Sequence, residues 1–112
     1  MPRAATTSDA FNAVAEPRRR EILVLLATSE RSVGEIVDAL GCGQPSVSKH
    51  LKVLRDVGLV DARREGRQVF YRTNFGALRP LHSWTNTLDQ LWRRHLSRIK
   101  ERAELASAAR KV

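Results

Sequence analysis

Polar side chains suited to hydrogen bonding gather in residues 44–55, which read QPSVSKHLKVLR. Val47, Leu51 and Leu54 recur at helical spacing, which predicts a helix with one apolar face. Seven polar residues occupy its remaining face: Gln44, Ser46, Ser48, Lys49, His50, Lys52 and Arg55. Amide and hydroxyl groups can bond the edges of bases, and lysine and arginine bind phosphate oxygens. The chemistry indicated is therefore recognition of a duplex nucleic acid through its major groove.

Each of these residues also has an ordinary structural interpretation. Gln44 and Ser46 could cap the helix, and Ser48 could bond its own backbone. His50 could be a packing histidine, and the cations could be solvated surface charges. A second basic cluster is formed by Arg63, Arg64 and Arg67, and it favours nucleic-acid binding over these structural interpretations.

Two short helices with a glycine-containing turn position the polar face. Ser32 followed by Glu35 is a capping-box signature for a helix over residues 33–40, and Gly41 and Gly43 end it. The next helix begins at Gln44 and stops at Gly58, which completes a helix-turn-helix over residues 33–58.

A hairpin is predicted directly after this motif, over residues 59–73. Two β-type runs, 59–64 and 67–72, flank Glu65-Gly66, and the second run alternates in polarity. Arginines 63, 64 and 67 would then stand on a wing beside the polar helix. The fold class expected is mainly α with a small β-hairpin (α+β), a winged helix-turn-helix with flanking helices.

Helices are also predicted on both sides of this motif. Before it lie a short helix over residues 10–15 and one from Pro17 to Thr28, with Arg18–Arg20 as a solvated surface or, less favoured, a DNA-backbone contact. After it, residues 78–106 form a long amphipathic helix, which Pro80 could interrupt near its start. Residues 1–7 are expected to be disordered, residues 8–106 to form one domain, and residues 107–112 to fray.

The long helix carries more large apolar residues than one small domain can cover: Trp84, Leu88, Leu91, Trp92, Leu96 and Ile99. Aromatic residues are enriched in interface cores. We expect some of the six to cover the chain's own core and others to meet a second copy.

Composition agrees with a polyanionic partner. The 112 residues carry a formal net charge of +8, and the single cysteine, Cys42, rules out an internal disulfide. No run of about 18 apolar residues and no secretory signal is visible, so a cytoplasmic location without a membrane partner is expected.

The sequence resembles the ArsR-type family of bacterial winged-helix repressors from about Phe11 to Tyr71. The resemblance lies in AEPRRREIL (15–23), SVGEI (32–36), PSVSKHLKVL (45–54), GLV (58–60) and GRQVFY (66–71). It implies a homodimer built by the first and last helices, which adds Phe11 to the interface set. It also implies an inverted-repeat operator, possibly in the protein's own promoter, and repression released by an unidentified signal.

Metal-sensing relatives hold their ligands on the first helix of the helix-turn-helix or on the last helix. Here the former contains no cysteine, and His82 and His95 do not match the Asp-x-His spacing of the latter, so no metal and no cofactor is expected. This resembles a non-metal-sensing branch. A metal- or redox-responsive repressor, the latter using Cys42, stays open as an alternative.

Three other functional classes fit the sequence less well. A non-specific architectural DNA-binding protein fits the charge, and the last helix could lie on a membrane surface. An enzyme is not expected, because no nucleophile–base pair, paired acid or phosphate-binding loop appears.

Overall fold

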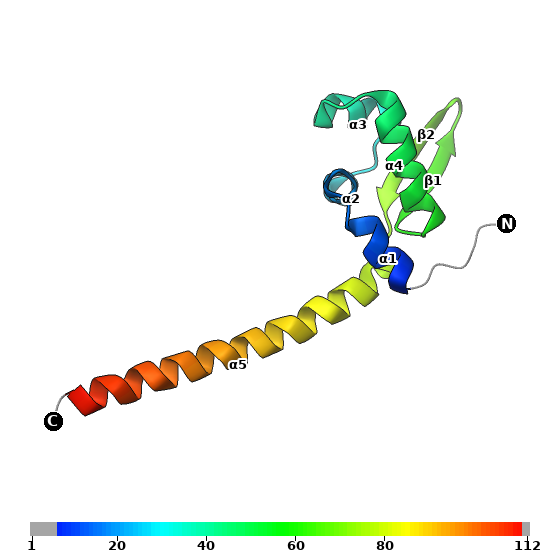
Figure 1. Ribbon diagram of the computed structural model, residues 1–112. Coiled ribbons are helices and arrows are strands. Elements are labelled where there is room, and N and C mark those ends of the chain that lie inside the picture. The colour runs from blue at the N-terminus through cyan, green and yellow to red at the C-terminus, as the bar shows by residue number, and fades with distance from the viewer. Residues whose placement is uncertain (1–6, 111–112) are drawn as a thin grey trace. The chain divides into compact units, whose positions relative to one another are not determined.

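The computed structural model describes residues 7–110, which are mostly helical with one two-stranded antiparallel hairpin, as predicted (Figure 1). The elements in chain order are α1 (Thr7–Val14), α2 (Pro17–Thr28), α3 (Val33–Leu40), α4 (Gln44–Asp56), β1 (Val60–Glu65), β2 (Gln68–Thr73), the short 3₁₀ helix η1 (Phe75–Leu78) and α5 (Arg79–Arg110). The chain divides into two compact units, and the boundary along the sequence falls between Leu81 and His82.

Helix α3 has the bounds that its local signals predicted. The Ser32 hydroxyl accepts a hydrogen bond from the Glu35 amide at 3.3 Å, and the Glu35 carboxylate accepts one from the Ser32 amide at 3.2 Å. Gly41 ends the helix with a φ of 68°, in the left-handed region that glycine tolerates best. These contacts fix where the turn before α4 begins.

The arginine run at the start of α2 serves α1. Arg19 Nε donates to the Ala13 carbonyl at 2.7 Å, and Arg20 Nη1 donates to the Val14 carbonyl at 2.8 Å. Both carbonyls lie at the negative end of α1, where cations are stabilising. The run is therefore neither a purely solvated face nor a free basic patch, and it ties α1 to α2.

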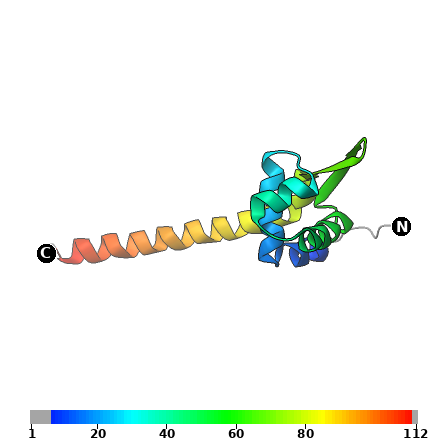
Figure 2. The ribbon, with the colours of Figure 1, turned by 90° about the horizontal axis from the view of Figure 1, so that it is seen from above.

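The hairpin turns one residue later than predicted. Glu65 pairs with Gln68, so the turn residues are Gly66 and Arg67 rather than Glu65 and Gly66. Gly66 has a φ of 62°, and a positive φ at the first turn residue alone is the pattern of a type II′ turn. Arg67 consequently lies at the tip of the hairpin, which extends beyond the cluster of helices (Figure 2).

The core lies among α1, α2, α3, α4 and the base of the hairpin. The apolar stripe predicted for α4 is buried as expected, with Val47, Leu51 and Leu54 each at most 2% exposed. The hydroxyl of Thr73, the buried last residue of β2, donates to the Leu23 carbonyl at 2.7 Å. The buried apolar residues are Ala10, Ala13, Ile22, Leu23, Leu26, Ile36, Val47, Leu51, Leu54, Leu59 and Val60.

Helix α5 is longer than predicted. It starts at Arg79, with Pro80 in the first turn where a missing N–H costs nothing, so Pro80 does not interrupt it. It continues to Arg110, so residues 107–110 are helical rather than frayed, and residues 111–112 lie outside the described range. Thr7 likewise belongs to α1, whereas residues 1–6 of the predicted disordered segment lie outside that range.

Candidate nucleic-acid interface

Helix α4 presents its predicted polar face to solvent. Six of its seven predicted site residues are exposed: Gln44, Ser46, Ser48, Lys49, Lys52 and Arg55. The N-cap is Gly43, which has no side chain, so Gln44 and Ser46 do not cap the helix. Ser48 donates no hydrogen bond to backbone within the described residues. The amide and hydroxyl groups are thus left available to an external partner.

The seventh residue, His50, is half-buried. Its Nδ1 atom is buried without a hydrogen-bond partner among the described residues. Burial lowers the pKa of His50 below its ordinary value of 6.5, and the charge of Arg19 lowers it further. A neutral, half-buried imidazole favours the packing interpretation over a cationic phosphate contact.

A groove separates α4 from the hairpin. It has a volume of about 390 Å³, and its lining residues are Ser48, Leu51, Lys52, Arg55, Asp56 and Tyr71. Lys52 and Arg55 place two cations along it, whereas Asp56 contributes one carboxylate. Three predicted site residues on the helix, Ser48, Lys52 and Arg55, therefore share a single concave surface with Tyr71 of the wing.

The two adjacent arginines of β1 fall on opposite faces of the hairpin. Arg64 pairs with Val69 and lies on the same face as Ala62 and Tyr71, the face that borders the groove. Arg67 stands at the hairpin tip and is also exposed. Arg64 therefore lies on the hairpin face that is turned towards α4, and Arg67 lies at the end of the hairpin.

Arg63 lies on the other face and is already paired. Its guanidinium contacts Glu30 at 2.9 Å and Glu65 at 3.0 Å, and it lies 5.2 Å from the centre of the Phe70 ring. The hydrogen bond from Arg63 lowers the pKa of Glu30, and the two carboxylates raise the pKa of Arg63. A DNA contact by Arg63 stays a prediction, and it would require breaking these pairs.

One basic residue beside the wing was missed by sequence reasoning. Arg31 forms a β-bridge with Tyr71, with backbone hydrogen bonds of 3.1 and 2.9 Å. Residues opposite each other in such a pair share a face, so Arg31 accompanies Tyr71 and Arg64. Its Nε atom is buried without a partner in the described part of the chain. No local signal could reveal it, because the bridge joins residues 40 positions apart.

The predicted interface residues of α5 are all exposed. Trp84, Leu88, Leu91, Trp92, Leu96 and Ile99 are each 43–56% exposed. Leu78 and Leu81 pack against the core, and the expectation that some of the six also cover it stays a prediction. Leu105, which the prediction omitted, is 71% exposed. Phe11 of α1 is half-buried.

Groups that could bind a metal ion are sparse. Within residues 7–110, no three His, Cys, Asp or Glu side chains gather closely enough to hold one. Cys42 is half-buried in the turn between α3 and α4, where it packs against the core. None of the described helices is both long and apolar enough to cross a membrane.

Several known proteins are similar to this chain in sequence and in fold. Residues 16–62 match the sequence profile of the bacterial regulatory protein, arsR family. HTH-type transcriptional repressor SmtB from Mycobacterium tuberculosis is 48% identical over 62 residues, which are 55% of this chain and 46% of that protein. Transcriptional repressor SdpR from Bacillus subtilis is 30% identical over 77 residues, which are 69% of this chain and 86% of that protein.

A solved structure extends the likeness. The homodimeric winged helix-turn-helix DNA-binding domain of a possible ArsR-family regulator from Mycobacterium bovis has a TM-score of 0.63 and 36% identity. The match covers 74% of this chain and 78% of that domain. By contrast, the chain spans less than half the length of SmtB.

Proposed function

Because the chain belongs to the arsR family of bacterial regulatory proteins, we propose that it is a sequence-specific, homodimeric transcriptional repressor. The observation that carries this proposal is the exposed polar face of α4 beside a basic groove and wing. Its operator is an inverted repeat, and its place of action is the cytoplasm, where bacterial DNA lies. It has no catalytic role.

Helix α4 reads bases, and the surrounding cations bind the backbone. A major groove accepts one α-helix, with the residues near the helix N-terminus closest to the base edges. Gln44 and Ser46 occupy the first turn of α4, so they select the sequence. Lys49, Lys52 and Arg55 bind phosphates, which contribute most of the affinity without selecting a sequence.

The wing adds contacts from one face only. Arg64 lies on the same face of the hairpin as Tyr71, which lines the groove, and Arg67 at the tip reaches phosphates or the minor groove beside α4. Arg63 holds the wing in place through Glu30, and a DNA contact by Arg63 would have to replace that pair. The net charge of +8 supports such a surface.

Dimerisation doubles the contact surface. The apolar face of α5, together with Phe11, joins two copies, so that two α4 helices reach successive major grooves about 34 Å apart. Because the second helix binds within an already tethered complex, two modest contacts give one tight complex. A homodimeric relative of the same fold supports this arrangement.

The test is a titration of the purified protein against duplex DNA from upstream of its own gene and against random duplex. At about 150 mM salt, we expect a preference for the upstream DNA of about 1,000-fold or more. Equal affinity for both duplexes would instead support an architectural protein. Release of DNA by zinc, reversed by a chelator, would identify a metal-responsive repressor.

Matched variants distinguish residues that contact bases from residues that contact phosphates. Gln44→Ala and Ser46→Ala should reduce the preference, because they remove base contacts. Arg64→Ala should weaken binding to both duplexes and reduce the slope of log affinity against log salt by about one. Arg93→Ala on α5 is the control, since Asp89 already pairs its charge, and it should leave the slope unchanged. An intact preference in both α4 variants would refute the assignment of the reading helix.

A further inference from the structure

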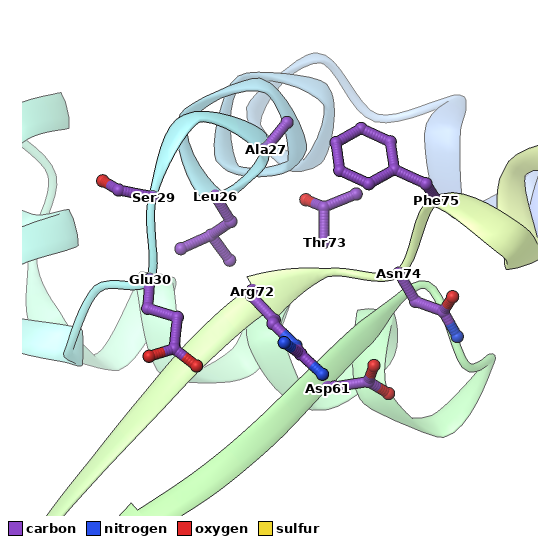
Figure 3. A pocket seen from close by; sticks show the side chains of 9 residues that line it. All are labelled: Leu26, Ala27, Ser29, Glu30, Asp61, Arg72, Thr73, Asn74 and Phe75. Carbon is purple, nitrogen blue, oxygen red and sulfur yellow. The ribbon is translucent and has the colours of Figure 1, made fainter.

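A second pocket lies on the face of the hairpin opposite to Tyr71 and the groove. Figure 3 shows the side chains that line it. It has a volume of about 360 Å³, within the range of roughly 300–1,000 Å³ that small ligands occupy. Nine residues line it: Leu26, Ala27, Ser29, Glu30, Asp61, Arg72, Thr73, Asn74 and Phe75. It therefore joins the end of α2, the base of the wing and η1.

The pocket is amphipathic. Leu26, Ala27 and Phe75 lie along one side of it, and the charged side chains lie along the other. The Phe75 side chain is 65% exposed although it is apolar. An apolar surface of this kind favours a ligand that covers it.

Two opposite charges in the pocket make no side-chain hydrogen bond. Asp61 and Arg72 are cross-strand partners in the hairpin, yet neither side chain makes a hydrogen bond or ion pair within the described residues, although the charge of Arg72 helps to lower the pKa of Glu30. Glu30, by contrast, is occupied by Arg63. The Thr73 hydroxyl is bonded to Leu23, and the Asn74 amide is bonded to Gly58 and Gly76. The polar groups free to bind a ligand are thus one carboxylate, one guanidinium and the Ser29 hydroxyl.

We propose that this pocket binds a small zwitterion with an apolar side chain, such as an α-amino acid. Arg72 binds the ligand carboxylate, because a guanidinium matches that group with two parallel hydrogen bonds. Asp61 binds the ligand ammonium, and the apolar side chain covers Ala27 and Phe75. Opposite charges on facing strand residues match the short separation of the two charges in such a ligand.

Binding here would alter the wing. Asp61 and Arg72 belong to β1 and β2, so a ligand that bridges them stiffens the hairpin that carries Arg64 and Arg67. This regulatory part rests on the proposed function, whereas ligand binding itself does not. The signal that relieves repression would then be a change in amino-acid concentration.

Isothermal titration of the full chain tests the binding. The probes are L-leucine and L-phenylalanine, with 4-methylpentanoate, 3-methylbutylamine and glycine as analogues lacking the ammonium, the carboxylate or the side chain. We expect at least one of the two amino acids to bind and each analogue to bind at least about tenfold more weakly. No heat from either amino acid at millimolar concentration would overturn the proposal, as would equal binding by the analogues.

Variants of the pocket give a second readout. Asp61→Asn and Arg72→Gln should each weaken amino-acid binding at least about tenfold, since each leaves one ligand charge unpaired. Asp38→Asn and Arg98→Gln make the same changes at exposed positions outside the pocket and should leave binding unchanged. Unchanged binding in both pocket variants would overturn the site. DNA titrations with and without L-leucine or L-phenylalanine then test regulation, and amino-acid binding without any effect on DNA would overturn that part alone.

Discussion

The two units of the chain differ in what they bury. Every buried apolar residue of the described chain lies between Ala10 and Val60, whereas none of the 32 residues of α5 is buried. Helices in proteins draw most of their stability from packing an apolar face. The first unit has its own core, and α5 has an apolar face without one. The proposed function accordingly assigns the reading of DNA and the joining of two copies to different regions.

A core truncation gives the largest expected effect. Leu54 of α4 is fully buried, so Leu54→Ala should lower the free energy of unfolding by about 2–5 kcal/mol. Leu105→Ala on α5 is the control, since that side chain is 71% exposed, and it should change stability by less than about 0.5 kcal/mol. Urea denaturation measures both. Equal losses of unfolding free energy in the two variants would contradict the difference in burial between the two units.

A charge on the apolar face of α5 should separate the copies while leaving the first unit folded. Leu88→Glu is expected to raise the dimer dissociation constant at least about 100-fold, because a carboxylate would be buried without a partner. Ser97→Glu adds the same charge on the opposite side of the helix and should leave the dimer intact. Sedimentation velocity reports the oligomeric state. A Leu88→Glu protein that stays dimeric would move the interface elsewhere.

The cap of α3 sharpens the comparison within the first unit. Ser32→Ala removes the hydroxyl that accepts from Glu35, and it should cost about 1 kcal/mol of unfolding free energy. Ser97→Ala in α5 removes an exposed hydroxyl that caps nothing. A thermal melt of both proteins should show a lower midpoint for Ser32→Ala only.

Acidification should produce the smallest change in the free energy of unfolding, and this change again comes from the first unit. The pKa of His50 is lowered in the folded chain, so the unfolded chain binds more protons as the pH falls below 6.5. Stability contributed by the neutral imidazole is therefore present above that pH and declines below it. His50→Gln should lose less stability between pH 7.5 and pH 5.5 than the wild type, measured by urea midpoints.

Local signals predicted the elements that depend on neighbouring residues. The capping box and Gly41 gave both ends of α3, and apolar spacing gave the buried face of α4. The end of α5 was placed too early because large apolar residues stop near Leu105. Residues 106–110 continue the helix because alanine, which occupies three of these five positions, favours helix most strongly.

Contacts between distant residues could not be predicted. The pair between Glu30 and Arg63 spans 33 residues, and it distinguishes Arg63 from Arg64 although the two are adjacent in sequence. Only the strand register shows which face each arginine occupies. The same holds for Arg31, whose place beside the wing depends on its bridge to Tyr71.

The outer edge of β1 has a further consequence, for self-association. Within the described chain, β1 pairs with β2 on one side only, and four of its six residues are charged: Asp61, Arg63, Arg64 and Glu65. Charged side chains on an open strand edge hinder the addition of another strand. The same charged residues therefore disfavour the pairing of one wing with another into a continuous sheet.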